Sequence, residues 1–234
     1  MTEIGRLSRR SDRIELDFVE RERTPRELMK LGIRLHLAVL SFSNTIVEIE
    51  KFGVERSRKA VHEWIQKADL QSATDAKPNH IVLDETVIRI NSQQFWLYAA
   101  VDPKTHKFLH VRLFTTTTTV STQRFLQELQ ENHDVSDAVF LVDHAKDLAA
   151  ALRRMGLRFH PVRHGNRNAV ERVFREVKRR TSSFGNSFGH VAPTTAETWL
   201  QAFAVRWNSL NYIRWRSSTI PVESSPNQHK LAHS

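Results

Sequence analysis

From residue 80 onward, the chain alternates strand-like and helix-like patterns in one order. Three runs rich in β-branched and aromatic residues come first, and a helix, a strand, a helix, a strand and two more helices follow. The expected strands cover 81–90, 94–101, 107–115, 138–142 and 157–162. The expected helices start at Ser121, which is taken as an N-cap, and then cover 146–154, 168–182 and 195–208. This order predicts an α/β domain.

The same order is the layout of a ribonuclease-H-like α/β domain, or integrase core. In that layout the first three strands form an antiparallel meander, and the first and fourth strands lie side by side. The fourth run, 138–142, is short and fully apolar, which is typical of a strand buried inside a mixed sheet. We therefore expect residues 80–212 to form a ribonuclease-H-like catalytic domain.

Residues 24–69 contain three shorter helical patterns. The first helix starts at Pro25, a favoured first position, and its apolar residues recur at helical spacing. A second helix fits 44–51, a turn with Gly53 follows, and Ser57 caps a third helix. Two helices joined by a glycine-containing turn predict a helix-turn-helix DNA-binding domain. A small helical bundle without a DNA role fits the same pattern.

The third of these helices, 57–67, has one polar and one apolar side. The side chains expected to face DNA are Arg58, Lys59 and His62. The side chains expected to be buried are Val61, Trp64 and Ile65.

The remaining segments are polar, and the composition limits the partners. We expect a charged arm at 1–23, a linker at 70–79 and a disordered tail at 213–234. The formal net charge is +9 and the pI is about 10.2, which favours a polyanionic partner such as DNA. The sequence has no cysteine, so cysteine zinc sites and disulfides are excluded. It shows no apolar run near twenty residues and no secretory signal, so we expect no membrane association and a cytoplasmic, nucleoid-associated location.

Three carboxylates stand at positions where they can meet. Asp84 and Asp143 follow apolar runs that predict neighbouring strands, and Glu171 begins a strongly helical, arginine-rich segment. Carboxylates grouped in this way hold divalent cations, because Mg²⁺ prefers a few carboxylates together with water and phosphate oxygens. A pair of such ions catalyses in-line phosphoryl transfer. The sequence therefore predicts a magnesium-dependent site for phosphodiester chemistry.

Each carboxylate also has an ordinary structural interpretation. An aspartate at the end of a strand is usually a turn or cap residue, and Glu171 can form an i, i+4 ion pair with Arg175. Glu85 is expected to point to the opposite face of the sheet from Asp84. A histidine zinc site is disfavoured, because Pro161 interrupts the i, i+4 pair of His160 and His164 and no HExxH motif occurs.

Basic residues concentrate between positions 151 and 190, where few acidic residues oppose them. A solvated charged surface is one interpretation, and phosphate binding is the one that the length of the bias favours. The residues expected to bind the DNA backbone are Arg163, Arg167, Arg172, Arg175, Lys178 and Arg179.

Four motifs together resemble transposases of the DDE class, and in particular insertion-sequence family six in its haloarchaeal-type branch. They are ELMKLGIRLHLAVLSFSNTIVEIEKFGVERSRKAVHEW, IVLDETVIRINSQQFWLYAAVDPKT, VFLVDHA and HGNRNAVERVFREVKRRTSSF. The resemblance covers about residues 1–212. It implies a ribonuclease-H-like core, Mg²⁺ or Mn²⁺ (two ions), double-stranded DNA with terminal inverted repeats as substrate, and strand transfer by an oligomer that is at least a dimer on DNA. By motif, Asp84, Asp143 and Glu171 bind the metals.

The chain departs from this family in three places. Only 27 residues, 144–170, separate Asp143 from Glu171. His144 stands where the family usually has glycine, and the tail beyond residue 212 does not resemble the family. Two other functions therefore stay open: an inactive remnant or DNA-binding regulator, and a ribonuclease-H-like nuclease without a joining step.

Overall fold

The computed structural model describes residues 16, 23–38, 40–68, 70, 75–143, 145–162, 168–183, 188–189 and 191–218. For 168–169, 180–183 and 211–218 only the backbone is described. Several predictions fall outside these residues: most of the arm 1–23, the side chains His144, Arg163 and Arg167, and the tail from residue 219.

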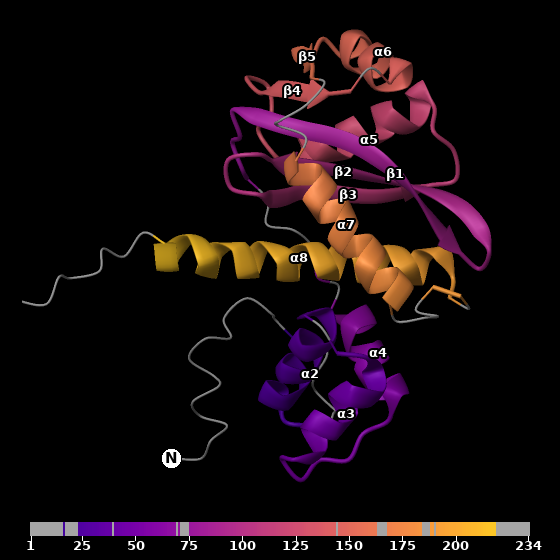
Figure 1. The fold of residues 1–234 in the computed structure, drawn as a ribbon, viewed down its shortest axis with the longest axis vertical. Coiled ribbons are helices and arrows are strands. Elements are labelled where there is room, and N and C mark those ends of the chain that lie inside the picture. The colour runs from indigo at the N-terminus through magenta and orange to yellow at the C-terminus, as the bar shows by residue number, and fades with distance from the viewer. Residues whose placement is uncertain are drawn as a thin grey trace, which may run out of the picture.

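One five-stranded sheet forms the centre of the larger domain (Figure 1). Its strands lie in the order β3-β2-β1-β4-β5. The pairs β1–β2 and β2–β3 are antiparallel, and β1–β4 and β4–β5 are parallel. This is the predicted ribonuclease-H-like topology, with the first and fourth strands side by side. The strands are β1 (His80–Ile90), β2 (Gln93–Asp102), β3 (Lys107–Phe114), β4 (Val139–Val142) and β5 (Phe159–Pro161).

Two tight turns connect the first three strands. Asn91 and Ser92 both have positive φ, 50° and 63°, which is the backbone of the two-residue turns whose twist suits a β-hairpin. In the next turn Asp102 accepts hydrogen bonds from the backbone N–H groups of Lys104 (2.8 Å) and Thr105 (3.4 Å). These local contacts set the register of the meander.

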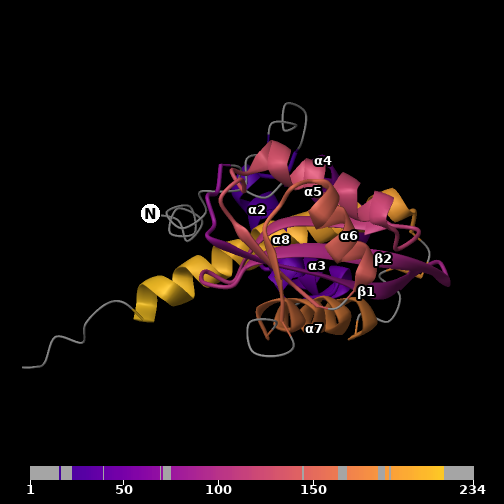
Figure 2. The same cartoon turned by 90° about the horizontal axis from the view of Figure 1, so that it is seen from above.

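Helices cover both faces of the sheet (Figure 2). On one face α5 (Thr119–Asn132) and α6 (Lys146–Arg154) pack on a core that includes Phe125 and Leu148. On the other face α7 (Asn168–Ser183) packs through Val170, Val173, Phe174 and Val177 on a second core. Of this set, Val173, Phe174 and Val177 are at most 6% exposed.

The strand β3 ends one residue before its expected end, and the run of threonines after it does not continue the strand. β3 ends at Phe114, and Thr118 is the N-cap of α5. Its hydroxyl accepts a hydrogen bond from the backbone N–H of Ser121 at 3.1 Å, so Ser121 lies in the first turn rather than at the cap. A β-branched run suits a strand, but threonine is also a good N-cap. The first N–H groups of α5 have no partner within the helix, so they favour the N-cap role of Thr118.

Three helices form the smaller, N-terminal part: α2 (Arg26–Ala38), α3 (Phe42–Glu50) and α4 (Arg58–Lys67). Ser41 and Ser57 cap α3 and α4, each accepting from a backbone N–H at 3.2 Å. Val61, Trp64 and Ile65 are at most 1% exposed, as predicted. Gly53 has φ 74° in the turn between α3 and α4.

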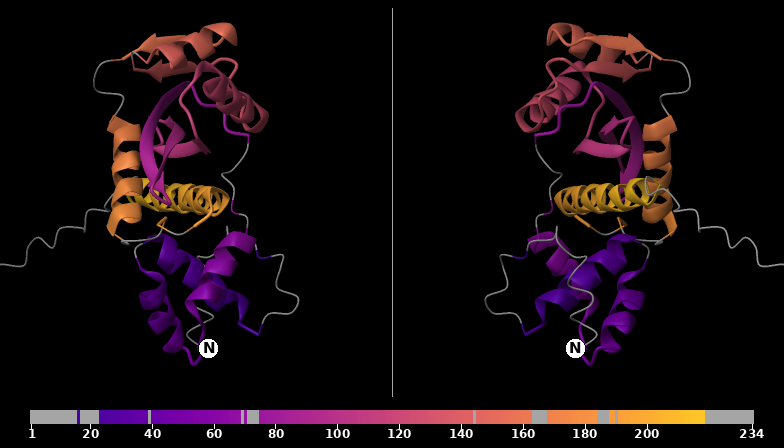
Figure 3. Two further views of the ribbon diagram at one scale, coloured as in Figure 1. Left: turned by 90° about the vertical axis from the view of Figure 1, so that its right-hand side faces the viewer. Right: turned by 90° about the vertical axis from the view of Figure 1, so that its left-hand side faces the viewer.

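The last helix, α8 (Pro193–Ser218), is longer than expected and joins the two parts. It lies between the sheet and α2–α4 (Figure 3). Trp199 is 7% exposed and donates its indole N–H to His36 of α2 at 3.1 Å. Trp207 donates to the carbonyl of His106 at 2.8 Å, and Asn208 bonds both the N–H and the carbonyl of Phe108 at 2.8 Å. The helix α8 thus packs on two sides, and a helix of this kind carries apolar residues around much of its circumference.

None of the helices in the described part of the chain has the length and apolar composition needed to cross a membrane.

Candidate active site

Asp84 and Asp143 are brought to neighbouring positions by the pairing of β1 with β4. In that pairing His80 aligns with Val139, Ile81 with Phe140 and Val82 with Leu141. Continuing the same parallel register by two residues aligns Asp84 with Asp143, which directly follows β4. Two residues aligned on adjacent strands are near neighbours, because strands in a sheet lie about 4.8 Å apart.

Both aspartates belong to the face of the sheet that α7 covers. Side chains alternate along a strand, and Val82 and Leu141 contribute to the core beneath α7. Asp84 and Asp143 each lie two positions further and therefore share that face. Glu85 belongs to the opposite face, as predicted: it aligns with Tyr98, which lies in the core beneath α5.

The two carboxylates are held by the backbone beside them. Asp84 is only 6% exposed, and its Oδ1 accepts a hydrogen bond from the N–H of Glu85 at 3.0 Å. Asp143 is half-buried, and its Oδ1 accepts from the N–H of Ala145 at 2.7 Å, just before α6 begins. Such contacts fix the two carboxylates in position.

Glu171 lies on the same side of the sheet but does not complete a metal centre in this structure. It stands in the first turn of α7, and its side chain is exposed. Among the residues that the structure describes, no three His, Asp or Glu side chains come close enough together to hold a metal ion. The two aspartates thus fit the donor set of a divalent cation, and the third carboxylate does not reach them. Mutual repulsion of carboxylates opposes their close approach without a cation.

The predicted basic residues of α7 that are described are all exposed: Arg172, Arg175, Lys178 and Arg179. Arg179 has a partner, because its Nε donates to Glu176 at 2.8 Å. That carboxylate raises the pKa of Arg179 above its ordinary value. No ion pair of Arg172 or Arg175 involves another described residue, so the ion pair suggested for Glu171 and Arg175 does not form.

The predicted DNA-facing side chains of α4 differ in their surroundings. Arg58 and Lys59 are exposed, and Lys59 lies 3.6 Å from Glu63 on the same helix. His62 is half-buried, and its ring meets that of Phe42 edge-on at 5.9 Å between centroids. The ring of His62 is therefore turned towards α3, unlike the other two side chains.

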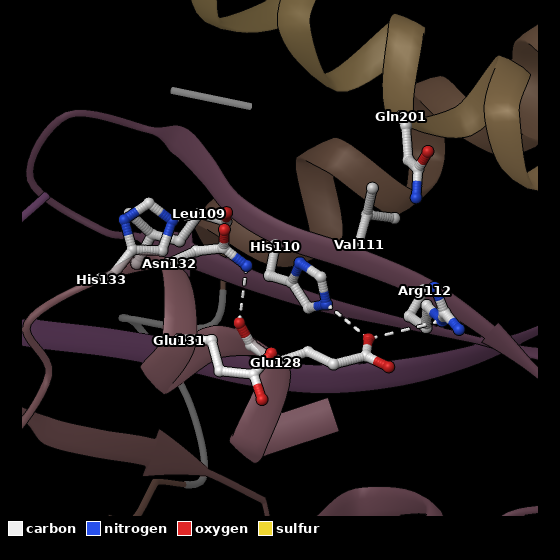
Figure 4. Close-up of a pocket in the computed structure, with 9 residues that line it drawn as sticks. All are labelled: Leu109, His110, Val111, Arg112, Glu128, Glu131, Asn132, His133 and Gln201. Atoms are coloured by element: carbon white, nitrogen blue, oxygen red, sulfur yellow. Dashed lines mark hydrogen bonds and ion pairs between the residues drawn. The ribbon is translucent and has the colours of Figure 1, made fainter. Parts of the chain in front are cut away.

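A polar cavity of about 190 Å³ lies between β3, α5 and α8, and sequence reasoning did not find it (Figure 4). Glu128 is its central group: it lies 3.1 Å from His110, 3.4 Å from Arg112 and 3.3 Å from Arg124. Arg112 also contacts Glu197 of α8 at 3.2 Å. The only sequence signal was the i, i+4 spacing of Arg124 and Glu128. This cluster binds the edge strand β3 to two helices and lies two strands away from β1.

In this mixed sheet Asp84, within β1, aligns with Asp143, directly after β4, and Glu171 lies on the covering helix. Together these features define a candidate phosphoryl-transfer domain. Comparison with known families agrees. The family model DDE_Tnp_IS240, described as a DDE domain, matches residues 78–207, more than half of the chain. The chain therefore belongs to this DDE-domain family, and the match supports a transposase of the DDE class, whose chemistry is the cleavage and transfer of DNA strands.

The individual proteins to which the chain is similar share little sequence identity with it. The chain is 27% identical over 198 residues to the uncharacterized protein MJ0017 of Methanocaldococcus jannaschii, covering 83% of this chain and 92% of that protein. It is similar to the catalytic core domain of BIV integrase (15% identity, TM-score 0.40, 54% of this chain and 82% of that one). It is also similar to the HTLV-2 integrase catalytic core domain solved with magnesium (14% identity, TM-score 0.40, 55% and 85%).

Proposed function

We propose that this protein is a transposase of insertion-sequence family six, of its haloarchaeal-type branch. It binds the terminal inverted repeats of its element and catalyses metal-dependent cleavage and transfer of DNA strands. The observation that supports this function best is the alignment of Asp84 with Asp143 on the face of the sheet beneath α7. The match of residues 78–207 to a DDE domain supports the same conclusion.

Asp84, Asp143 and Glu171 would hold the metal, Mg²⁺ or Mn²⁺, in the form of two ions. When bound, such a pair lowers the barrier to attack on a phosphodiester by activating the nucleophile and stabilising the leaving oxygen. Asp84 and Asp143 supply fixed oxygen donors, because backbone N–H groups already orient them. Glu171, in the first turn of α7, would supply the third carboxylate.

The helices α2–α4 would act as the helix-turn-helix that reads the repeats. Arg58 and Lys59 of α4 are exposed and available for bases or phosphates, and His62 is part of the same predicted surface. The DNA backbone would be held by the basic residues near the carboxylates, without reading of sequence. These are Arg163, Arg167, Arg172, Arg175, Lys178 and Arg179.

Two DNA ends must be joined to one target, so we propose at least a dimer on DNA. The protein would act in the cytoplasm on nucleoid DNA. Its partners are double-stranded DNA and further copies of the same chain.

The test is Mg²⁺-dependent cleavage of DNA that carries the inverted repeats flanking the gene. Asp143→Asn should abolish cleavage and joining while duplex binding stays within about twofold of the parent, because the change removes one metal-binding charge. Asp137→Asn, an exposed aspartate six residues upstream, serves as the matched control and should cleave normally. Cleavage that persists in Asp143→Asn would rule out the proposed triad. Cleavage by the parent without joining would indicate a nuclease instead.

One observation favours a second candidate, a DNA-binding regulator without catalysis. Within the described residues the three carboxylates are not gathered into a metal site. This candidate predicts sequence-specific binding to the repeats with no cleavage in Mg²⁺ or Mn²⁺. Titrating the parent with Mn²⁺ separates the two candidates, because a transposase should gain cleavage and a regulator should not.

A further inference from the structure

A hydrogen bond between two side chains joins the first turn of α5 to the first turn of α6. The hydroxyl of Thr119, the first residue of α5, donates to Oδ1 of Asp147 at 2.7 Å. Asp147 is the second residue of α6, and both residues are half-buried. A hydrogen bond to a carboxylate is roughly twice as strong as one between neutral groups. The bond therefore fixes the start of one helix against the start of the other.

The start of α6 also holds Asp143. The N–H of Ala145 donates to Oδ1 of Asp143 at 2.7 Å. Ala145 is the N-cap of α6, and it has no side-chain group that could cap the helix. Asp147 follows two residues later, where its charge suits the positive end of the helix. A shift of this first turn would move the N–H group that orients the carboxylate of Asp143.

The start of α5 is fixed to the sheet by hydroxyl groups. Tyr98 of β2 is fully buried, and its hydroxyl lies 3.0 Å from that of Thr117 and 3.4 Å from that of Thr122. Thr118 is the N-cap of α5. Three successive hydroxyls of the threonine run therefore have separate partners. The first contacts the sheet, the second caps α5 and the third, from Thr119, binds α6.

We propose that Thr119 and Asp147 are positioning residues for Asp143. They belong to α5 and α6, which cover the face of the sheet opposite to α7 (Figure 2), so they act through the N–H of Ala145 and not on the metals. Removing a group that orients a metal ligand lowers metal affinity or activity by about 10- to 100-fold. The inference rests on the proposed function for the role of Asp143, but its contacts can be tested without metal.

The first measurement is amide hydrogen exchange of the full-length protein without metal or DNA, followed in peptides that contain Ala145. Thr119→Val keeps the shape of the side chain but removes the hydroxyl. It should speed exchange in these peptides about tenfold, the equivalent of one lost hydrogen bond to a charged group. Thr119→Ser keeps a hydroxyl and should exchange like the parent. Exchange in β1, β2 and β3 should not change in either variant.

Thr105→Val is the matched control. Thr105 also donates its hydroxyl to an aspartate, Asp102, at 2.7 Å. This bond lies in the turn between β2 and β3, strands that do not pair with β4, so its loss should speed exchange only in that turn. Equal exchange around Ala145 in Thr119→Val and Thr119→Ser would overturn the proposal, as would faster exchange throughout the domain in Thr119→Val.

Asp147→Asn replaces Thr119→Val if that variant does not fold. It keeps an oxygen acceptor but loses the charge, so exchange around Ala145 should rise by about threefold. An unchanged rate in Asp147→Asn would contradict the proposal in the same way.

The second measurement is the affinity for metal. In Thr119→Val the affinity for Mn²⁺, measured by calorimetry, should fall about tenfold, and the Mg²⁺ concentration for half-maximal cleavage of repeat DNA should rise by about the same factor. Duplex binding should stay within about twofold of the parent, because no group that contacts DNA is changed. Thr119→Ser and Thr105→Val should match the parent in all three.

The outcomes also distinguish this inference from the proposed function. If exchange around Ala145 rises in Thr119→Val but neither metal measurement changes, the bond is only structural, the positioning role is wrong and the function stands. If the parent binds Mn²⁺ but never cleaves, the transposase assignment fails, and the fall in Mn²⁺ affinity alone decides the positioning role. If the parent neither binds Mn²⁺ nor cleaves, both are wrong.

Discussion

At the scale of single residues, Glu128 shows how one half-buried carboxylate can hold three elements together. Burial acts to raise the pKa of Glu128, but the hydrogen bond with His110 and the charges of Arg112 and His110 outweigh it, so the pKa lies below its ordinary value of 4.5. The charged form is therefore the one that the folded protein binds more strongly. A group of this kind stabilises the fold above its unfolded pKa, and the stabilisation is lost as the pH falls through its folded pKa.

We expect Glu128→Gln to lower the free energy of unfolding by about 1 kcal/mol at pH 7, the usual size for a hydrogen bond to a charged group that stays partly solvated. The difference from the parent should shrink below pH 4.5, because the parent then loses the same charge. Chemical denaturation at pH 7, 5 and 3.5 measures it. Glu131→Gln, one turn away, exposed and lining the same cavity, is the control. A difference that stays constant with pH would show that the charge of Glu128 does not matter.

At the scale of secondary structure, local pattern was enough wherever a local interaction decides the outcome. The helix α6 begins and ends at the predicted residues, and the strands of the meander agree within about two positions. Pattern did not predict contacts between elements that are distant in the sequence, such as the hydrogen bond from Trp199 of α8 to His36 of α2. It also missed the exact ends of two helices: Thr118 rather than Ser121 caps α5, and α8 extends to Ser218.

The candidate site could also be predicted only in part. The positions of Asp84 and Asp143 could be predicted, because strand order and register fix them. The reach of Glu171 could not, since it depends on where α7 settles along the sheet. The cluster around Glu128 was also missed, because its members come from three elements that are distant in the sequence.

The helix α7 yields a prediction of its own. Arg175 and Arg179 are both exposed, but Arg179 already donates to Glu176. We therefore expect Arg175→Gln to reduce the slope of log DNA affinity against log salt by about one unit, and Arg179→Gln to reduce it by clearly less. Binding should weaken equally for repeat and unrelated DNA, because phosphate contacts carry no sequence information. An unchanged slope in Arg175→Gln would mean that α7 is only a solvated surface.

At the scale of the whole molecule, the two parts of the chain meet through aromatic and amide groups. His36 stacks on Phe42 with 3.8 Å between ring centroids and accepts the indole N–H of Trp199. Gln66 of α4 donates to the carbonyl of Thr195 at 3.5 Å. Gly32 lets α2 approach α3 and α4 closely, because a Cβ there would lie 2.9 Å from Ile49 and 3.2 Å from Trp64. Two hydrogen bonds, from Trp199 to His36 and from Gln66 to Thr195, thus connect α2–α4 to α8.

Trp199→Phe tests this connection. The change keeps an aromatic ring against His36 but removes the indole N–H, so we expect about 1 kcal/mol less stabilisation of the docked arrangement. Small-angle scattering should then report a larger radius of gyration, and proteolysis between the two parts should become faster. Trp207→Phe is the matched control: Trp207 donates to His106 within the sheet domain, so its loss should lower the unfolding temperature without separating the parts. If both tryptophan variants changed the radius of gyration equally, the contact between Trp199 and His36 would not be what holds the two parts together.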